Sequence, residues 1–356
     1  VQSMCATKTQ DIKATLAQIN SLQEHGADII RIAVDSRKDV EALAEIRKNT
    51  DARLVVDLQE NYRLATLLAP YVQKIRYNPG HLFHHEKHIS VKEKVAFLVE
   101  VARKHNLAIR IGINSGSIDP ALKNLGKKDF AAALSSAREH VAIMEDLKFE
   151  NYLLSLKSSD PNEVIEINEA FAKEYPFIPL HLGVTEAGML PMGEAKTRLA
   201  FENLLARGIG ETLRVSLTLP HAEKFREVEI GRQIIEDVYS GRFKSTPRFA
   251  HNGLNIISCP SCSRVENEAF IQLAEKVRDM AAFASSEKIT IAIMGCRVNG
   301  PGETDDADLG LWCAPNHVNL KRKGQLIGVF SYEEILEQTR QQLLQLIDTR
   351  KNKHVL

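Results

Sequence analysis

Short apolar, β-rich runs alternate with longer segments of helical spacing through the first two thirds of the chain. The runs occupy residues 1–3, 29–34, 53–58, 74–78, 108–113, 151–157, 178–184 and 212–218. A strand followed by a helix, repeated in this way, predicts parallel strands joined by crossover helices. Eight strands in about 240 residues are the number and size typical of a closed (β/α)8 barrel. We therefore expect an α/β fold built on a TIM-type barrel.

A doubly wound open sheet is the alternative arrangement of the same elements. No Gly-x-Gly-x-x-Gly follows the first run, so the dinucleotide-binding form of that fold is disfavoured. Periodicity is lost before residue 254, and Gly, Ser, Pro and Asn gather there as they do in linkers. Beyond this stretch we expect strands at 254–258 and 288–294, a hairpin region at 309–330, and helices at 267–283 and 332–348. The sequence thus predicts a barrel at 1–240, a linker at 241–253 and a smaller α+β domain at 254–356.

The charge balance restricts the partners that the chain could bind. Lys and Arg number 46, as do Asp and Glu, and nucleic-acid modules usually carry a basic excess instead. No apolar run approaches the roughly 18 residues of a membrane span, and no signal peptide pattern opens the sequence. Five cysteines, an odd number in a large chain, suit reduced thiols or metal ligands better than disulfides. We expect a cytoplasmic protein that binds neither nucleic acid nor membrane.

Polar side chains occur in the barrel runs where a packed interior needs none. In a barrel of this class, polar residues near the carboxyl ends of the strands face the active-site mouth. Five cations from five different runs would repel one another there unless an anion lay among them, and guanidinium groups suit phosphate oxygens. A small diphosphorylated substrate is therefore predicted. The cations are Arg31, Arg76, Arg110, Lys157 and Arg214, and the other polar residues are Asp57, Asn78, Asn114, His181, Glu186 and Ser216.

Three cysteines follow two apolar runs of the smaller domain. Cys259-Pro-Ser-Cys262 follows one, and Met294-Gly-Cys296-Arg-Val-Asn-Gly-Pro-Gly-Glu303 follows the other, so the two turns could bring the three thiolates together. One explanation is a structural zinc site closed by Cys313 as the fourth ligand. The other is an iron–sulfur cluster with one iron open or weakly held by an oxygen ligand, for which Glu303 is a candidate. Both explanations remain open on residue chemistry alone.

The motifs resemble one known family along nearly the whole chain. CPSC, MGCRVNGPGE and the following ADLG resemble the C-terminal domain of the hydroxymethylbutenyl diphosphate synthases of the non-mevalonate isoprenoid pathway. VQSM, ADIIRIAV, KIRYNPG, IRIGINSGS, SLKSSD, HLGVTEAG and ETLRVSLT agree with the barrel domain of that family in the same order. The resemblance implies a reductive ring opening of 2-C-methyl-D-erythritol 2,4-cyclodiphosphate to 4-hydroxy-3-methylbut-2-enyl diphosphate. It also implies a [4Fe–4S] cluster and reduced ferredoxin or flavodoxin as the electron donor.

The resemblance assigns roles residue by residue. Cys259, Cys262 and Cys296 would ligate the cluster, with Glu303 on the fourth iron in the absence of substrate, and Glu186 would lie beside the reacting carbons. Gln59 stands where the family usually has a His, so it keeps a binding role but cannot become a cation. Cys5 and Cys313 are expected to be incidental thiols. The residues expected to bind the substrate are Arg31, Gln59, Arg76, Asn78, Arg110, Asn114, Lys157, Arg214 and Ser216.

The linker adds an expectation about assembly. A flexible segment of about fourteen residues has a root-mean-square reach of only about 20 Å, and the last barrel helix should run away from the mouth. The smaller domain should therefore find it hard to cover its own barrel. We expect a two-fold homodimer with cross-subunit active sites, as the resemblance also implies. The rival function is a barrel that binds a phosphorylated ligand without redox chemistry and carries a structural zinc domain.

Overall fold

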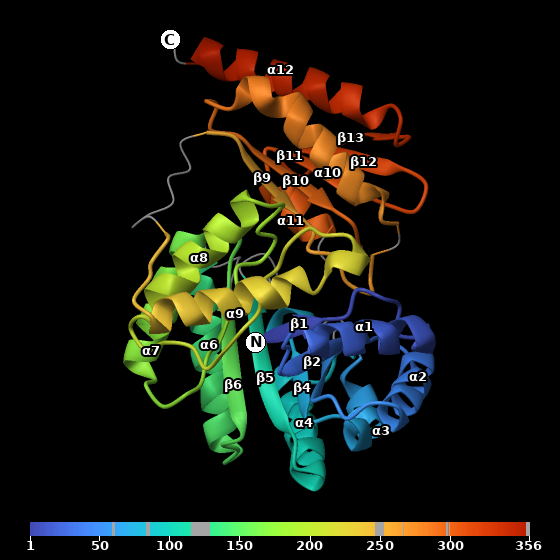
Figure 1. Ribbon diagram of the computed structural model, residues 1–356, viewed down its shortest axis with the longest axis vertical. Coiled ribbons are helices and arrows are strands. Elements are labelled where there is room, and N and C mark those ends of the chain that lie inside the picture. The colour runs from blue at the N-terminus through green and yellow to red at the C-terminus, as the bar shows by residue number, and fades with distance from the viewer. Residues whose placement is uncertain are drawn as a thin grey trace.

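The computed structural model describes residues 1–58, 61–82, 86–114, 129–245, 253–265, 267–296, 298 and 300–353. Two units are stacked along the long axis of the molecule, and the C-terminal unit lies above the barrel unit in Figure 1. Each unit has its own cluster of buried apolar side chains: one draws on residues from Cys5 to Ile234 and the other on residues from Ile257 to Ile347. The expected limits of the two domains and of the linker stay predictions, because residues 246–252 lie outside the described part.

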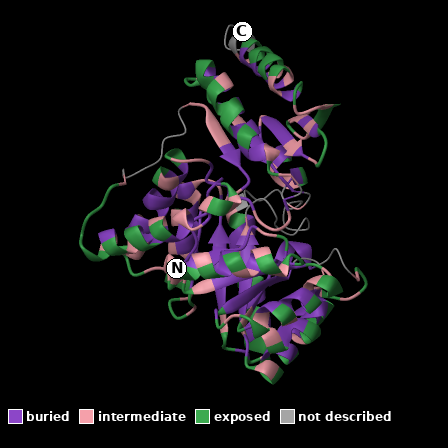
Figure 2. Ribbon diagram, turned by 45° about the vertical axis from the view of Figure 1, so that its right-hand side comes forward, coloured by how far each residue is buried: buried purple, intermediate pink, exposed green. Residues whose placement is uncertain are grey.

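Eight parallel strands form the barrel unit, as the alternation predicts. The first six pair in chain order in one sheet, and β7 pairs with β8. An isolated parallel bridge from Leu154 to Leu180 connects β6 to the segment that leads into β7. Figure 2 shows these strands as the buried centre of the unit. The strands are β1 Gln2–Met4, β2 Ile29–Val34, β3 Leu54–Leu58, β4 Lys74–Tyr77, β5 Ala108–Asn114, β6 Tyr152–Lys157, β7 His181–Leu182 and β8 Thr212–Leu213.

Helices follow most of the strands and cover the outside of the sheet (Figure 1). Local sequence sets their starts: Ser36 and Ser90 each form a capping box with an acidic residue three positions later. The segment between β3 and β4 contains short helical turns around Ala65–Leu68. The helices are α1 Ile12–Glu24, α2 Arg37–Lys48, α3 Ala65–Leu68, α4 Val91–His105, α6 Asp129–Asp146, α7 Pro161–Glu174, α8 Met192–Leu205 and α9 Arg226–Tyr239.

The C-terminal unit is a mixed five-stranded sheet in the order β13-β12-β11-β10-β9. The strands β9, β10 and β11 are parallel, whereas β12 and β13 continue the sheet antiparallel. The expected hairpin region at 309–330 therefore holds three strands. The elements are β9 Asn255–Ser258, α10 Ala269–Met280, β10 Thr290–Met294, α11 Gly300–Asp306, β11 Leu309–Cys313, β12 Val318–Arg322, β13 Gln325–Phe330 and α12 Ile335–Lys353. None of the helices in the described ranges combines the length and apolar character that a membrane crossing requires.

The C-terminal unit lies on the mouth of the barrel in the same chain. The hydroxyls of Thr218 and Ser258 hydrogen-bond across the boundary, and the Lys224 ammonium donates to the carbonyl oxygen of Ser261 at 3.3 Å. The expectation that the unit should find it hard to cover its own barrel is therefore wrong in this structure. A root-mean-square length describes a free coil, whereas fourteen extended residues can span up to about 46–50 Å. The homodimer itself stays a prediction.

Candidate active site

Strand register places the charged side chains of the barrel at one level. Asp57 on β3 is aligned with Arg76 on β4, which is aligned with Arg110 on β5. Neighbouring strands lie about 4.8 Å apart, so the two guanidinium groups start from adjacent positions despite their like charge. The sequence leaves room for the long side chains. A Cβ at Gly112 would lie 2.2 Å from Nε of Arg76.

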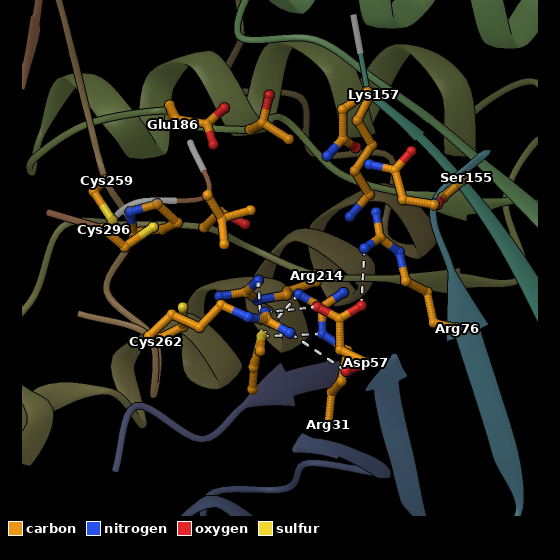
Figure 3. Close-up of a pocket in the computed structure, with 18 of the residues that line it drawn as sticks. Arg31, Asp57, Arg76, Ser155, Lys157, Glu186, Arg214, Cys259, Cys262 and Cys296 are labelled. Atoms are coloured by element: carbon orange, nitrogen blue, oxygen red, sulfur yellow. Dashed lines mark hydrogen bonds and ion pairs between the residues drawn. The ribbon is translucent and has the colours of Figure 1, made fainter. Parts of the chain in front are cut away.

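These side chains surround a pocket between the two units (Figure 3). The empty space among these side chains is about 770 Å3 when the part open to solvent is included. Six cationic side chains but only two carboxylates are among the described residues that line it. The lining comprises Met4, Arg31, Asp57, Arg76, Asn78, Arg110, Asn114, Ser155, Lys157, Thr185, Glu186, Arg214, Ser216, Cys259, Pro260, Cys262, Arg264, Cys296 and Val298.

The arginines of the pocket differ in how many of their guanidinium N–H groups donate hydrogen bonds to other residues. Arg76 donates to Asp57 Oδ1 at 2.8 Å and to the carbonyl of Gly112 at 3.2 Å. Arg31 donates to the thioether sulfur of Met4 at 3.0 and 2.9 Å, and sulfur is a weak acceptor. Arg110 and Arg214 each have two buried guanidinium nitrogens without a hydrogen-bond partner among the described residues. Donors buried in this way are costly unless a ligand accepts from them.

Burial and mutual repulsion lower the pKa values of these cations. Burial and the nearby Arg214 and Arg76 lower the pKa of Arg31 to about 9, even though Asp57 opposes the shift. The pKa of Arg110 falls well below its ordinary value, first through burial and then through Arg31 and Arg76. Burial and Arg110 also lower the pKa of Lys157. An anion in the pocket would reverse these effects, because it favours the charged form of every cation around it.

Glu186 brings a carboxylate into the same pocket. It follows β7, is 2% exposed, and adopts a left-handed backbone conformation with φ of 47°. Non-glycine residues in this region are strained and are often found at functional sites. In Figure 3 the carboxylate of Glu186 lies on the side of the pocket where Cys259 and Cys296 are found.

The three cysteines predicted as ligands line the same pocket. Cys259 follows β9 and Cys296 follows β10, and these neighbouring parallel strands bring their carboxyl ends together. A hydrogen bond to the Cys296 thiol, burial and the nearby Cys262 raise the pKa of Cys259 well above its ordinary value. If all three thiols ionised, their negative charges would repel one another unless a cationic group lay among them. The donor set therefore fits a positively charged metal core.

Cys313, the fourth ligand of the zinc alternative, lies apart from the three cysteines of the pocket. It is buried on β11 and is not among the residues that line the pocket. The four-cysteine zinc site is therefore not favoured by this structure.

Glu303 and Gln59 are the predicted site residues that are not among the described residues lining the pocket. Glu303 lies on the first turn of α11 and is not among the lining residues. Gln59 lies outside the described residues, so the structure does not place it. His181 on β7 pairs its Nδ1 with the Thr212 hydroxyl at 2.8 Å. Burial and then Lys157 lower the pKa of His181 well below 6.5, so this imidazole is neutral.

The structure also adds residues that the sequence analysis missed. Arg264, Ser155, Thr185 and Met4 line the pocket. Arg264 could have been suspected, because it comes two residues after Cys262 in an otherwise small and polar turn. Nothing in the sequence pattern singles out Ser155, which is a small residue inside an apolar strand.

Comparisons with known proteins cover the same two units. The family model described as the GcpE TIM-barrel domain matches residues 1–232, and that of the GcpE protein C-terminal domain matches residues 255–345. A 4-hydroxy-3-methylbut-2-en-1-yl diphosphate synthase (flavodoxin) of Rhodopirellula baltica is 57% identical over 99% of this chain and 92% of its own length. A protein of the same name from Bacillus licheniformis is 37% identical over 98% of this chain and 89% of its own length.

A solved structure resembles the barrel more distantly. The crystal structure of dihydropteroate synthase from Stenotrophomonas maltophilia with active site-bound imidazole covers 69% of this chain and 93% of that chain. Its sequence identity is 11% and its TM-score is 0.48, values too low to carry an argument.

Proposed function

The chain belongs to the GcpE family, and from that premise we propose how its pocket performs the reaction of 4-hydroxy-3-methylbut-2-enyl diphosphate synthases. The enzyme is an oxidoreductase of isoprenoid biosynthesis that converts 2-C-methyl-D-erythritol 2,4-cyclodiphosphate to 4-hydroxy-3-methylbut-2-enyl diphosphate. The reaction consumes two electrons and releases one water, and it takes up one proton when the terminal diphosphate formed carries one more negative charge than the cyclic one. The alternative of a barrel without redox chemistry and with a zinc domain is not favoured, because Cys313 lies away from the pocket.

One observation carries the assignment of the pocket. Buried guanidinium nitrogens of Arg110 and Arg214 have no hydrogen-bond partner among the described residues, in a pocket that three cysteines of the other unit also line. A diphosphate would accept from those nitrogens while its carbon skeleton faced the cysteines. The same side chains therefore explain both the recognition of the anion and its position relative to a redox group.

The cations also favour the product side of the ring opening. When the bond between the tertiary carbon and the phosphate oxygen breaks, the cyclic diphosphate becomes a terminal one and gains a negative charge. Donors that are already aimed into a water-poor pocket stabilise charge as it develops, without reorganising. We assign the diphosphate to Arg31, Arg76, Arg110, Asn114, Lys157, Arg214 and Ser216, with Asn78 and Gln59 as further binding residues.

We propose a [4Fe–4S] cluster held by Cys259, Cys262 and Cys296. When bound, the cluster supplies electrons one at a time and a Lewis-acidic iron. Glu303 as the oxygen ligand of the fourth iron stays a prediction, because α11 keeps it outside the lining of the pocket. We propose that Glu186, which lines the pocket, lies beside the reacting carbons, where its carboxyl group could hold or transfer a proton.

The electron donor is a protein partner. The relatives named above carry flavodoxin in their names, and we propose that a flavodoxin reduces this chain as well. Ferredoxin is the alternative donor. We also propose a homodimer with cross-subunit sites. If two chains exchanged their C-terminal units across a two-fold axis, the contacts that this structure shows within one chain would form between the two subunits. A cytoplasmic location fits the use of such donors.

Anaerobic purification followed by metal analysis and assay tests the proposal. We expect about four irons and four sulfides per chain, a brown protein, and turnover of the cyclic diphosphate with reduced flavodoxin. The Arg110→Ala variant should keep its iron but bind the substrate weakly. A colourless protein that contains zinc, or an iron-loaded protein that binds no cyclic diphosphate, would contradict the assignment.

A further inference from the structure

Arg264 joins the two units at the edge of the pocket. It lies two residues beyond Cys262, yet its guanidinium reaches two carboxylates at the carboxyl ends of barrel strands. Nε and Nη2 donate to the two carboxylate oxygens of Asp35, each at 3.0 Å. Nη1 donates to Asp57 Oδ2 at 3.1 Å, and the Arg264 side chain is only 10% exposed.

Every guanidinium nitrogen of Arg264 has a carboxylate partner, which is not so for Arg110 and Arg214 among the described residues. All three of its nitrogens bond to carboxylates, and Nη2 also approaches the carbonyl oxygen of Asp57 at 3.4 Å. Arg110 and Arg214, in contrast, each have two buried nitrogens without a hydrogen-bond partner among the described residues, although Arg214 Nη2 lies 3.9 Å from Glu227 Oε2. Arg264 therefore lines the pocket without being directed at a ligand in it.

Asp57 connects this contact to the diphosphate-binding side. Its Oδ1 accepts from Arg76 of the barrel at 2.8 Å, and its Oδ2 accepts from Arg264 of the C-terminal unit. Burial alone would raise the pKa of Asp57, but Arg76 and the other cations hold it well below its usual range. The carboxylate is therefore charged, and it bridges one cation from each unit.

We propose that Arg264 is a positioning residue that seats the cysteine turn on the barrel mouth through Asp35 and Asp57. Because Arg264 is two residues from Cys262, its anchoring sets where the thiols stand relative to the substrate pocket. The meaning of that distance for catalysis rests on the proposed function. The contact between the units does not, so it can be tested separately.

Three variants divide the contact into parts. Arg264→Gln removes the charge, and Arg264→Lys keeps it but loses the two-pronged bond to Asp35. Asp35→Asn removes the partner on the rim and leaves the pair of Asp57 and Arg76 intact. The matched control is Arg278→Gln, because Arg278 on α10 pairs only with its neighbour Asp279 among the described residues and is half exposed.

Small-angle scattering of the anaerobic, iron-loaded chain measures how closely the units are seated. We expect Arg264→Gln and Asp35→Asn to increase the radius of gyration and to lower kcat about ten- to a hundredfold, the range for a lost charge-assisted bond. Iron content and the Kd for the cyclic diphosphate should stay within about twofold of wild type. The double variant should be no worse than Arg264→Gln, Arg264→Lys should recover part of both effects, and the control should match wild type.

Three results would overturn the inference. The first is scattering and kcat like those of wild type in both Arg264→Gln and Asp35→Asn. The second is loss of iron in either variant, which would make the contact a requirement for cluster assembly instead. The third is a Kd weakened as much as in Arg110→Ala, which would make Arg264 a substrate ligand. If wild type does not turn over the cyclic diphosphate but the scattering difference is seen, the proposed function fails and the seating contact stands.

Discussion

Replacing Arg110 by methionine should stabilise the substrate-free protein and lower its affinity for the substrate. The Arg110 side chain is 1% exposed, and its Nε and Nη1 have no hydrogen-bond partner among the described residues. Each buried donor left unpaired costs about 1–3 kcal/mol. Methionine removes both donors and the repulsion from Arg31 and Arg76, while it keeps most of the apolar stem. We expect a net gain of about 1–3 kcal/mol in the free energy of unfolding.

The effect on binding has the opposite sign. Each charge-assisted hydrogen bond to a phosphate oxygen contributes about 1.5–3 kcal/mol, so its loss weakens binding about ten- to a hundredfold. Arg110→Lys should restore only part of this affinity, because an ammonium lacks the forked geometry. Titration calorimetry with the cyclic diphosphate measures the Kd. Anaerobic thermal unfolding, with and without the substrate, measures the stability.

Arg76→Met is the matched comparison, since Arg76 lies beside Arg110 in the sheet. The Arg76→Met variant removes the guanidinium that donates to buried Asp57 at 2.8 Å. Among the described residues, Arg264 is then the remaining ion-pair partner of Asp57. We expect a loss of up to about 3 kcal/mol in the free energy of unfolding, because a buried charge loses compensation. The reasoning is refuted if Arg110→Met destabilises the free protein as Arg76→Met does. It is also refuted if Arg110→Met binds the substrate as tightly as wild type.

Three other predictions address the cysteines, the assembly and the dependence on pH. Cys296→Ser should abolish iron loading, while Cys313→Ser should keep it. Cys313 is a buried thiol with a pKa raised to about 12, on a strand away from the pocket. Iron content per chain is the measurement, and normal iron loading of Cys296→Ser would contradict the ligand assignment. Mixing Cys296→Ser and Arg110→Ala chains should restore activity if the units are exchanged between subunits, whereas no rescue after proven subunit exchange would mean that each chain caps its own barrel. Burial lowers the pKa of His140 to about 4 from 6.5, so the fold binds fewer protons than the unfolded chain between these values. Its contribution of about 3 kcal/mol is full above pH 6.5 and is lost as the pH falls to 4. In denaturant titrations at several pH values, His140→Gln should reduce the loss of unfolding free energy between pH 6.5 and pH 4. An unchanged dependence of the unfolding free energy on pH would show that His140 does not cause this loss.

Much of the architecture could be predicted from the sequence because the signals are local. Strand periodicity placed β2, β5 and β6 to within a residue or two. The strands β7 and β8 are shorter than expected, since only two residues of each keep ladder hydrogen bonds. Periodicity reports which side chains are buried, and it does not report where hydrogen bonding between strands ends.

The residues of the site were predicted from charge and motif, but the hydrogen bonds and ion pairs among them were not. Repulsion among the five barrel cations was enough to predict an anion, and all five line the pocket. The reach of the linker was misjudged, because an average coil length says nothing about a segment held at both ends by packed units. Arg264 was missed because its partners, Asp35 and Asp57, lie more than 200 positions away in the chain.

The sequence by itself determined the repeated strand–helix order, the five barrel cations and the three cysteines of the second unit. These depend on residue type and spacing along one chain segment, and such information is complete in the sequence. Only the tertiary structure decided that Arg76 and Arg264 are neutralised by Asp57 while Arg110 and Arg214 keep unused donors. The division depends on register between strands and on contact between units. Identical side chains acquire different roles there because each meets different neighbours in space.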